Sequence, residues 1–553
     1  MPTGNRLYYG DNLQVLREHV EPASVDLVYL DPPFNSNRSY NVLFKSQAGV
    51  EAQAQIEAFD DTWHWTQQTE ELYASIIAGG APIKVSEAVE AMHSLVGPND
   101  VLAYLVMMSA RLIELHKTLK STGALYLHCD PTASHYLKII LDAIFGPQNF
   151  RSEIIWKRSH AHSGGNRFGP IHDTILFYAA SEQHQCVPVR LPYSDEYVSQ
   201  FFRFADPDGR QYRSTILTGS GTRNGDSGLP WREVNPTDSG RHWAVPGYLR
   251  SLFEEPIPTT VQQALDRLDE MGRILWPKKE QGVPSLKQYI DDMEGVEAQD
   301  IWSDIPPIGA RAAERLGYPT QKPIALLERI IQSSSQVGDT VLDPFCGCGT
   351  AVDAAQNLGR KWIGIDITYL AIDLIRKRLQ HSYGPDFENQ YSVRGIPTDT
   401  QGATALFEEN PFDFERWAVS LVNGEPNQKQ VGDKGIDGRI RFQSGRSEYG
   451  TVIVSVKGGT HINPAMVRDL VGTVERQKAE MGLLITLAKP TRGMTDEADH
   501  SGTYSNEFTG NSFPKVQIIS VEDLMGGKRP NMLTPIIPYI KASPRPVAAD
   551  PLF

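Results

Sequence analysis

The chain has 553 residues and a formal net charge of −14, with 22% charged and 40% hydrophobic residues. This length predicts more than one domain, and the composition excludes a disordered or fibrous chain. We find no N-terminal secretory pattern and no apolar run long enough to span a bilayer, so we expect a cytoplasmic protein without a membrane partner. Its four cysteines are too few for a disulfide framework in a chain of this size.

The first motif follows an apolar run at residues 25–30, which predicts a buried strand. The run ends in Asp31-Pro32-Pro33-Phe34. The Asp31 carboxylate and the Pro32 carbonyl can accept both hydrogens of an exocyclic amino group, which returns its delocalised lone pair to the nitrogen. Phe34 can stack on a base that is flipped out of a duplex. Residues 31–34 are therefore the expected catalytic residues, and the alternative is an ordinary turn after a strand.

A glycine-rich turn follows a second apolar run at residues 340–342 and reads Asp343-Pro344-Phe345-Cys346-Gly347-Cys348-Gly349-Thr350. Its glycines allow a sharp turn and a close approach to a ligand. A helix is expected next, and then a strand that ends at Asp366, 23 residues after Asp343. This is near the spacing at which a carboxylate binds ribose hydroxyls in nucleotide-binding βαβ units. A phosphate-binding loop is disfavoured because no Gly-Lys-Ser/Thr follows.

The middle of the chain, residues 186–310, shows no alternation of strands and helices. Basic and aromatic residues are interleaved there, as in the segments 201–204, 210–213, 231–232, 241–243 and 276–279. A chain with negative net charge needs such local positive potential to bind DNA. For each segment the alternative is an aromatic ring packed under a solvated arginine, so the expectation of DNA binding applies to the region as a whole.

In this order, the two motifs resemble those of the β class of amino-group DNA methyltransferases, in which the catalytic segment precedes the cofactor segment. Segments at residues 9–12, 125–131, 153–158 and 320–323 are also similar to this family. The resemblance implies a target-recognition role for residues 186–310. It also implies that S-adenosylmethionine is bound by Asp11, Asn12, Thr320, Gln321, Lys322, Pro323, Asp343, Phe345, Cys346, Gly347, Gly349, Thr350 and Asp366.

The reaction implied by the resemblance is direct methyl transfer to the amino group of a flipped-out base in double-stranded DNA, within a restriction-modification system. Neither a covalent enzyme intermediate nor a metal ion is expected for this step. An aspartate before Pro32-Pro33 resembles adenine-N6 enzymes, but the same acceptors would polarise cytosine N4, which stays the alternative. The resemblance implies a prokaryotic or phage-encoded protein and leaves a homodimer open.

A second pattern begins near residue 411 with an amphipathic helix, a hairpin, a lysine-bearing strand, a helix and a strand. Over about residues 411–525 this order resembles the Mrr-type restriction endonuclease domain. The resemblance places Glu415, Asp437 and Lys457 at positions that coordinate Mg²⁺ and activate water. Ser455 stands where that family has Glu or Gln, and a neutral hydroxyl is a weaker ligand for Mg²⁺ than a carboxylate. A nuclease that cuts DNA with Mg²⁺ and a former nuclease kept for binding both stay open.

The expected fold class is α/β, with a Rossmann-like doubly wound methyltransferase domain and a C-terminal α/β restriction-endonuclease-like domain that folds separately. The Asp31 and Asp343 turns should lie side by side, at the carboxyl ends of neighbouring strands. We expect the catalytic segment to span residues 1–185, the recognition insertion 186–310 and the cofactor segment 311–395. A linker at 396–410, the C-terminal domain at 411–540 and a flexible tail at 541–553 should follow.

Overall fold

The structure is a computed structural model of the chain. It describes residues 4–33, 39–45, 51–60, 64–160, 166, 168–277, 282–309, 312–316, 318, 320–427, 435–445 and 448–535. The chain divides into two compact units. The larger comprises residues 1–187 and 299–553, and the smaller comprises residues 188–298.

The larger unit contains a nine-stranded sheet with the order β16-β6-β7-β5-β2-β17-β18-β1-β19. Its strands are β1 (Asn5–Tyr9), β2 (Val25–Leu30), β5 (Leu119–Cys129), β6 (Phe150–Lys157), β7 (His172–Ala179), β16 (Ile301–Trp302), β17 (Thr340–Asp343), β18 (Lys361–Asp366) and β19 (Tyr391–Arg394). Neighbours are parallel except where β7 meets β5 and β6. The predicted α/β class is confirmed, although hydrophobic periodicity could not predict these two antiparallel pairs.

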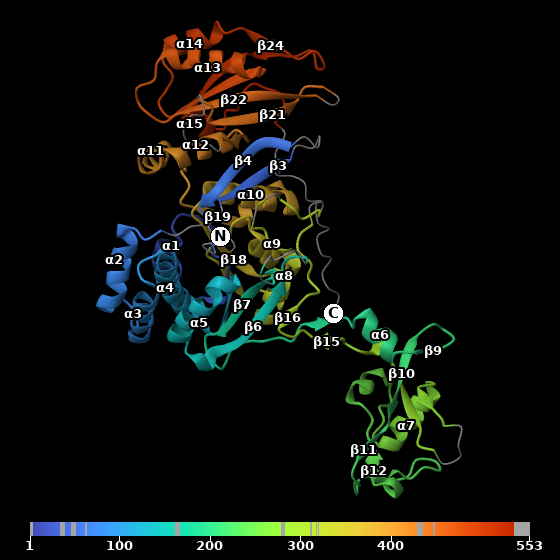
Figure 1. Ribbon diagram of the computed structural model, residues 1–553. Helices are drawn as coiled ribbons and strands as arrows, with labels where there is room; N and C mark the ends of the chain where they lie inside the picture. Colours follow the sequence, from blue (N-terminus) through green and yellow to red (C-terminus); the bar gives the residue numbers. More distant parts are fainter. Residues whose placement is uncertain are drawn as a thin grey trace. The chain divides into compact units, whose positions relative to one another are not determined.

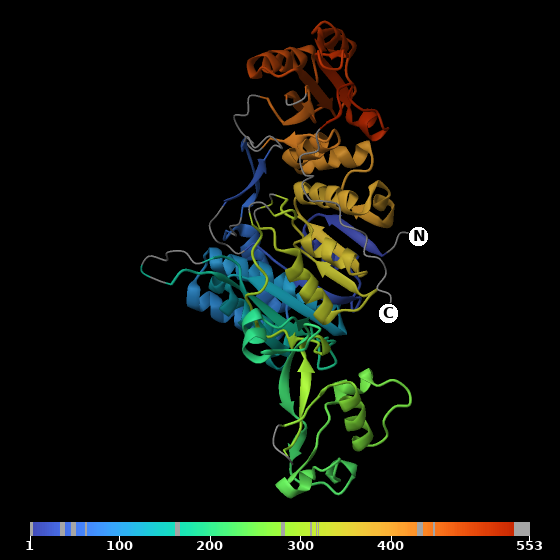
Figure 2. The ribbon, with the colours of Figure 1, turned by 90° about the vertical axis from the view of Figure 1, so that its right-hand side faces the viewer.

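Helices cover both faces of this sheet, and each face has its own hydrophobic core (Figures 1 and 2). One core is formed with α1 (Asn12–His19), α3 (Ile83–Val96), α4 (Asp100–Thr118) and α5 (Pro131–Phe145). The other is formed with α8 (Ile324–Ser334), α9 (Thr350–Asn357) and α10 (Tyr369–Tyr383). The helix α2 (Gln67–Ser75) contacts α4, and β3 (Ser39–Lys45) pairs with β4 (Glu51–Asp60). This arrangement is the doubly wound one that was expected.

The two strands that carry the sequence motifs are neighbours in the sheet, although they are far apart in the chain. In β17, Val341 and Leu342 lie opposite Leu27 and Val28 of β2. All six residues of β2 are buried, as an apolar strand covered on both faces requires. Parallel neighbours end at the same edge of a sheet, so the turns after β2 and β17 lie side by side.

The C-terminal region of the larger unit has a five-stranded sheet of β20 (Glu425–Pro426), β21 (Gly438–Gln443), β22 (Tyr449–Lys457), β23 (Met481–Thr486) and β26 (Val516–Ser520). The remaining elements are α11 (Thr400–Glu409), α12 (Pro411–Ser420), α13 (Pro464–Gln477), α14 (Arg492–Asp499), β24 (Thr503–Ser505), β25 (Ser512–Pro514) and α15 (Val521–Met525). The predicted order of helix, hairpin, strand, helix and strand is confirmed. Within the predicted linker, Ala403 and Leu406 of α11 belong to the core of this region. The tail 541–553 lies outside the described residues.

The smaller unit has a four-stranded antiparallel sheet of β13 (Ile274–Leu275), β14 (Ser285–Tyr289), β10 (Gln211–Ile216) and β9 (Phe204–Ala205). Its other elements are β8 (Arg190–Leu191), α6 (Asp195–Phe201), β11 (Thr218–Ser220), β12 (Arg241–Trp243), α7 (Val261–Glu270) and β15 (Val296–Glu297). Its core includes Trp231, Trp243 and Leu265. The first and last strands pair with each other, with Leu191 opposite Val296, so the two ends of the unit meet.

Candidate active site

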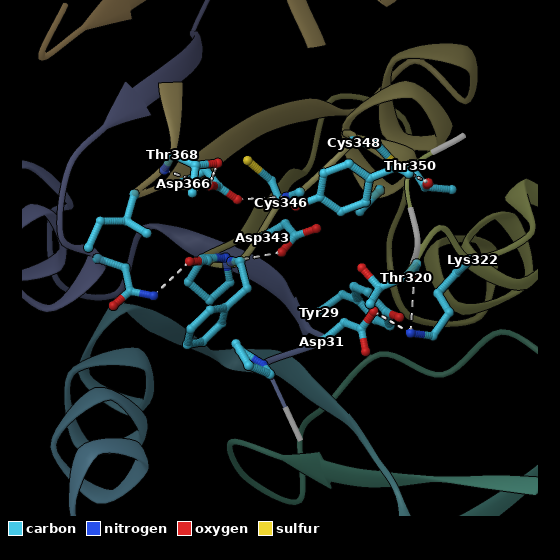
Figure 3. A pocket seen from close by; sticks show the side chains of 18 of the residues that line it. Tyr29, Asp31, Thr320, Lys322, Asp343, Cys346, Cys348, Thr350, Asp366 and Thr368 are labelled. Carbon is cyan, nitrogen blue, oxygen red and sulfur yellow. Dashed lines mark hydrogen bonds and ion pairs between the residues drawn. The ribbon is translucent and has the colours of Figure 1, made fainter. Parts of the chain in front are cut away.

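A pocket of about 370 Å³ lies at the edge of the sheet where β1, β2, β17 and β18 end (Figure 3). This volume is in the range of small-molecule sites. The pocket brings together most of the residues expected from the sequence. Those that line it are Asp11, Asn12, Asp31, Pro33, Thr320, Gln321, Lys322, Asp343, Phe345, Cys346, Gly347, Thr350 and Asp366.

The other expected residues of the site do not line this pocket or lie outside the described chain. Pro32 is buried next to Asp31. Pro323 precedes the first residue of α8, and Gly349 precedes α9 with a φ of 74°. A Cβ at Gly349 would lie 2.7 Å from the Ile375 side chain, so packing leaves no room for a larger residue at this position. Phe34 lies outside the described residues.

Asp31 follows the last residue of β2 and forms an ion pair with Lys322. The Lys322 ammonium donates to Asp31 Oδ2, and the two side chains are only 10% and 14% exposed, lysine first. Lys322 also donates to the Thr320 carbonyl at 3.4 Å. Gln321 stabilises the loop that carries Lys322, because its amide donates to the Glu314 carbonyl and accepts from the Leu316 N–H. The pair therefore fixes the Asp31 carboxylate at the carboxyl end of β2.

The glycine-rich turn after β17 is held by hydrogen bonds from its own backbone. Asp343 Oδ1 accepts from the Phe345 N–H at 3.0 Å, and Asp366 Oδ2 accepts from the Gly347 N–H at 2.9 Å. Gly347 has a φ of 48°, and a Cβ there would meet the Tyr318 ring at 3.2 Å. The close neighbour of Gly347 is thus a buried tyrosine. Asp366 also accepts from the Thr368 N–H and hydroxyl, both at 2.8 Å.

Arg111 is a buried residue of the pocket that the sequence motifs missed. It donates to Asp11 Oδ2 at 2.7 Å and to Asn12 Oδ1, and its side chain is 3% exposed. Asp11 caps α1 through the N–H groups of Leu13 and Gln14. The signal for Arg111 was available, because it is a lone charge within the apolar stretch of α4. Pro344 and Cys348 line the pocket as part of the predicted glycine-rich turn, and the other lining residues, which were missed, are Tyr29, Gln68, Met107, Tyr318, Leu327, Ala351, Ile367 and Thr368.

Acidic side chains outnumber basic ones around the pocket. Asp11, Asp31, Asp343 and Asp366 line it, and the lysines and arginines that line it are Arg111 and Lys322. Burial raises the pKa of Asp343 well above its usual range, and the nearby Asp31 and Asp366 raise it further, against the Phe345 N–H bond and Lys322. Burial also raises the pKa of Asp366, against its bonds from Thr368 and Gly347. A positively charged ligand would relieve this repulsion, so the site fits a sulfonium compound.

The nuclease-like positions form a separate cluster in the C-terminal region. Asp437 Oδ2 accepts from Ser455 Oγ at 3.2 Å and from the Val456 N–H at 2.5 Å. Lys457 Nζ lies 3.7 Å from the same oxygen. Glu415 lies on α12. Within the described residues of the chain, no group of three or more His, Cys, Asp or Glu side chains could hold a metal ion.

Comparison with known protein families supports this picture. The model of the N6/N4 DNA methylase family matches residues 25–377. The chain belongs to this DNA methylase family. A second model, described as a NACHT-associated inactive restriction endonuclease, matches residues 413–524 and confirms a restriction-endonuclease-like C-terminal domain. Among the helices of the described residues, none has the length and apolar character to cross a membrane.

Among curated proteins, the methylase is similar to type II methyltransferase M.EcaI of Enterobacter cloacae, with 28% identity over 69% of this chain and 70% of the relative. It is also 25% identical to the Mod subunit of the type III enzyme StyLTI of Salmonella typhimurium, over 65% of this chain and half of that protein. The solved PvuII cytosine-N4 methyltransferase is 14% identical, over 68% of this chain and 87% of that one, with a TM-score of 0.31. Because this TM-score is low, the fold is assigned from the strand order of the nine-stranded sheet.

Proposed function

We propose that this methylase transfers the methyl group of S-adenosylmethionine to N6 of adenine in double-stranded DNA. The observation that carries the proposal is the pocket that joins Asp31 at the end of β2 to the glycine-rich turn after β17. An acceptor for an amino group and a loop for a cofactor therefore lie within reach of one another. Membership of the DNA methylase family supports the same chemistry.

Asp31 and the Pro32 carbonyl would each accept one hydrogen from the amino group of the base. Two such bonds draw the delocalised lone pair back onto the nitrogen, which makes it nucleophilic. The ion pair with Lys322 fixes the position of the Asp31 carboxylate, whose side chain is only 14% exposed.

The cofactor would be held on the opposite side of the pocket by the residues that end β1, β17 and β18. Asp366 would accept from ribose hydroxyls, and Phe345 and Ile367, which also line the pocket, would offer apolar contacts. The acidic lining suits the sulfonium and ammonium charges of S-adenosylmethionine. When bound, this group supplies an electrophilic methyl group on a positively charged sulfur.

Residues 188–298 are proposed to bind the target DNA. Their aromatic and basic residues are arranged in stacked pairs, with the Arg232 guanidinium 4.9 Å from the Trp231 ring and 5.1 Å from the Trp276 ring. Trp276, Phe204 and Ile216 are exposed. The arginines also form ion pairs within the unit, Arg232 with Asp269 and Arg210 with Asp291 and Asp292. The support thus comes from the exposed aromatic and basic residues rather than from every arginine.

Adenine is favoured over cytosine by the resemblance of Asp31-Pro32-Pro33 to adenine-N6 enzymes. The test is incubation of unmodified DNA with purified protein and S-adenosylmethionine, followed by digestion to nucleosides and mass spectrometry. N6-methyladenine is the expected product, and modification-sensitive sequencing of the same DNA gives its sequence context. N4-methylcytosine would assign the site to the alternative base, and the absence of any methylated base would refute the proposal.

A further inference from the structure

A line of buried polar side chains leads away from the pocket beside Asp31. Tyr29 is in β2, lines the pocket and lies beside Asp31 (Figure 3). Its hydroxyl is 3.1 Å from Nδ1 of His128 in the neighbouring strand β5. Nε2 of His128 is in turn 3.0 Å from Oδ2 of Asp173 in the next strand, β7. Three adjacent strands therefore each contribute one residue to this hydrogen-bonded line.

The charge of Asp173 fixes the direction of these hydrogen bonds. Burial alone would raise the pKa of Asp173, but the hydrogen bond to His128 and the charges of Lys322 and Arg158 lower it below its usual range. Asp173 is therefore an acceptor, and Nε2 of His128 carries the proton that it receives. With Nε2 donating to Asp173, Nδ1 is the ring nitrogen left to accept, and the Tyr29 hydroxyl donates to it.

Burying the His128–Asp173 pair inside the sheet carries a desolvation cost. His128 is 0% and Asp173 is 2% exposed, and the ring edge of His128 meets Trp156 at 5.7 Å between centroids. Apolar residues would fill three neighbouring strands without this desolvation cost. The charged groups around the line are Asp31 and Asp343 near Tyr29, and Lys322 and Arg158 near Asp173. Arg158 lies 3.2 Å from Asp173 Oδ1 and is 37% exposed.

We propose that Tyr29, His128 and Asp173 accept the proton that the base nitrogen loses on methylation, an inference that rests on the proposed function. The nitrogen lone pair forms the new bond to the methyl carbon, the carbon–sulfur bond breaks, and sulfur keeps its electron pair. The nitrogen is then positively charged, and its N–H bond breaks with the electrons returning to nitrogen. Asp31, which holds the released proton first, passes it to the Tyr29 oxygen while the Tyr29 proton passes to His128 Nδ1. The resulting imidazolium is stabilised by Asp173.

Asp31 is a poor final acceptor for this proton. Its carboxylate is the counter-ion of Lys322, so protonating it would leave a buried ammonium unpaired. It would also remove the acceptor that the amino group of the next base requires. The histidine holds the proton until product leaves, when it returns through Tyr29 to water in the opened pocket.

The test is the single-turnover rate of methyl transfer as a function of pH, in the full chain with S-adenosylmethionine bound. In the parent, the rate should fall on the acid side as His128 takes a proton before the reaction. His128→Asn should be slower by roughly 10²-fold or more, the range for a lost acid–base group, and should lack this acid limb. Its affinity for S-adenosylmethionine should stay within a few-fold of the parent. His135→Asn, on the exposed side of α5, is the matched control and should behave as the parent.

Two further variants separate proton transfer from a structural role. Tyr29→Phe keeps the ring and should also slow the reaction and abolish the acid limb, which keeps the test decisive if His128→Asn fails to fold. Asp173→Asn should move the acid limb to lower pH, because the imidazolium loses its counter-ion. A parent that methylates DNA together with variants that keep the parental rate and pH profile would overturn the inference. A parent that forms no methylated base would instead refute the proposed function.

Discussion

At the scale of single residues, the side chain of Asp343 ends the buried strand β17 and is 4% exposed. Burial raises its pKa well above the usual range for aspartate. A carboxyl whose pKa is raised by folding binds a proton more tightly in the folded protein. Its contribution to stability is therefore complete below the unfolded pKa and is lost as pH rises through the folded pKa. Near neutral pH the ligand-free protein is destabilised by this group.

Asp343→Asn should therefore raise the midpoint of thermal unfolding of the ligand-free protein near neutral pH. The gain should shrink as pH is lowered, because the parental Asp343 becomes neutral there. The same variant should bind S-adenosylmethionine more weakly, since one negative charge facing the sulfonium is lost. Thermal unfolding across pH and calorimetric titration check both effects. A variant that is less stable than the parent at every pH would contradict the account.

Asp31→Asn tests the acceptor at the base. The amide keeps the shape of the side chain but cannot offer a charged oxygen to the amino group or to Lys322. Transfer of tritiated methyl groups should fall by roughly 10²–10³-fold, the cost of a lost hydrogen bond at a reacting centre. Affinity for S-adenosylmethionine should change by a few-fold at most. The exposed Asp499→Asn serves as control, and a rate near the parental one would remove Asp31 from the reaction.

At the scale of elements, α12 joins the C-terminal region to the strands that hold the cofactor loops. Tyr9, which ends β1, donates to Asp413 of α12 at 2.9 Å. Ser420 at the other end of α12 donates to the hydroxyl of Tyr369, which begins α10, at 3.0 Å. Tyr369 belongs to the same core as Phe414 of α12. These contacts argue against the separable C-terminal domain expected from the sequence.

A chain that stops after residue 395 should consequently be less stable than the parent, by roughly 2–4 kcal/mol from lost burial and hydrogen bonds. Its affinity for S-adenosylmethionine should fall, because Tyr9 and Tyr369 adjoin the loops that line the pocket. Tyr9→Phe in the full chain should lower the free energy of unfolding by about 1 kcal/mol, because it removes the hydrogen bond to Asp413. Denaturant unfolding and calorimetry provide the measurements. A truncated chain with parental stability and affinity would restore the separable domain.

The side chains in and beside β22 predict whether the C-terminal domain cleaves DNA. Ser455 supplies no charge, and Asp437 is already bonded to Ser455, Val456 and Lys457. We expect no cleavage of unmodified plasmid with Mg²⁺ or Mn²⁺, since hard cations favour carboxylate ligands. Robust cutting that is lost in both Asp437→Ala and Lys457→Ala would show that the domain is an active nuclease.

At the scale of the whole molecule, apolar runs in the sequence predicted central strands of the sheet, and the family resemblance implied most of the pocket residues. Apolar runs that end in acids or glycines placed Asp31, Asp343 and Asp366 at one edge. Arg111 and Tyr29 were missed because they reach the pocket from a helix and a strand interior, outside the turns that carry the motifs. The contact of α12 with β1 was beyond prediction for the same reason, since it depends on packing between distant segments.

We expect that the smaller unit can be deleted without loss of cofactor binding by the larger unit. Leu191 and Val296 are already paired, so a two-residue turn could join β8 to β15 as a hairpin. A chain in which such a turn replaces residues 192–295 should bind S-adenosylmethionine like the parent and lose methylation of DNA. Calorimetry and the tritium assay measure the two properties. Retained site-specific methylation would place target recognition elsewhere.

The pairing of β8 with β15 also bears on how the chain folds. β16, directly after the smaller unit, pairs with β6, which precedes it, so the main sheet closes across an intervening loop. The entropic cost of closing a loop grows as about (3/2)RT ln n with its length n. Once residues 188–298 have folded, the pairing of Leu191 with Val296 takes residues 192–295 out of that loop. Substitutions in the core around Trp243 should therefore slow formation of the methylase sheet without touching its active site.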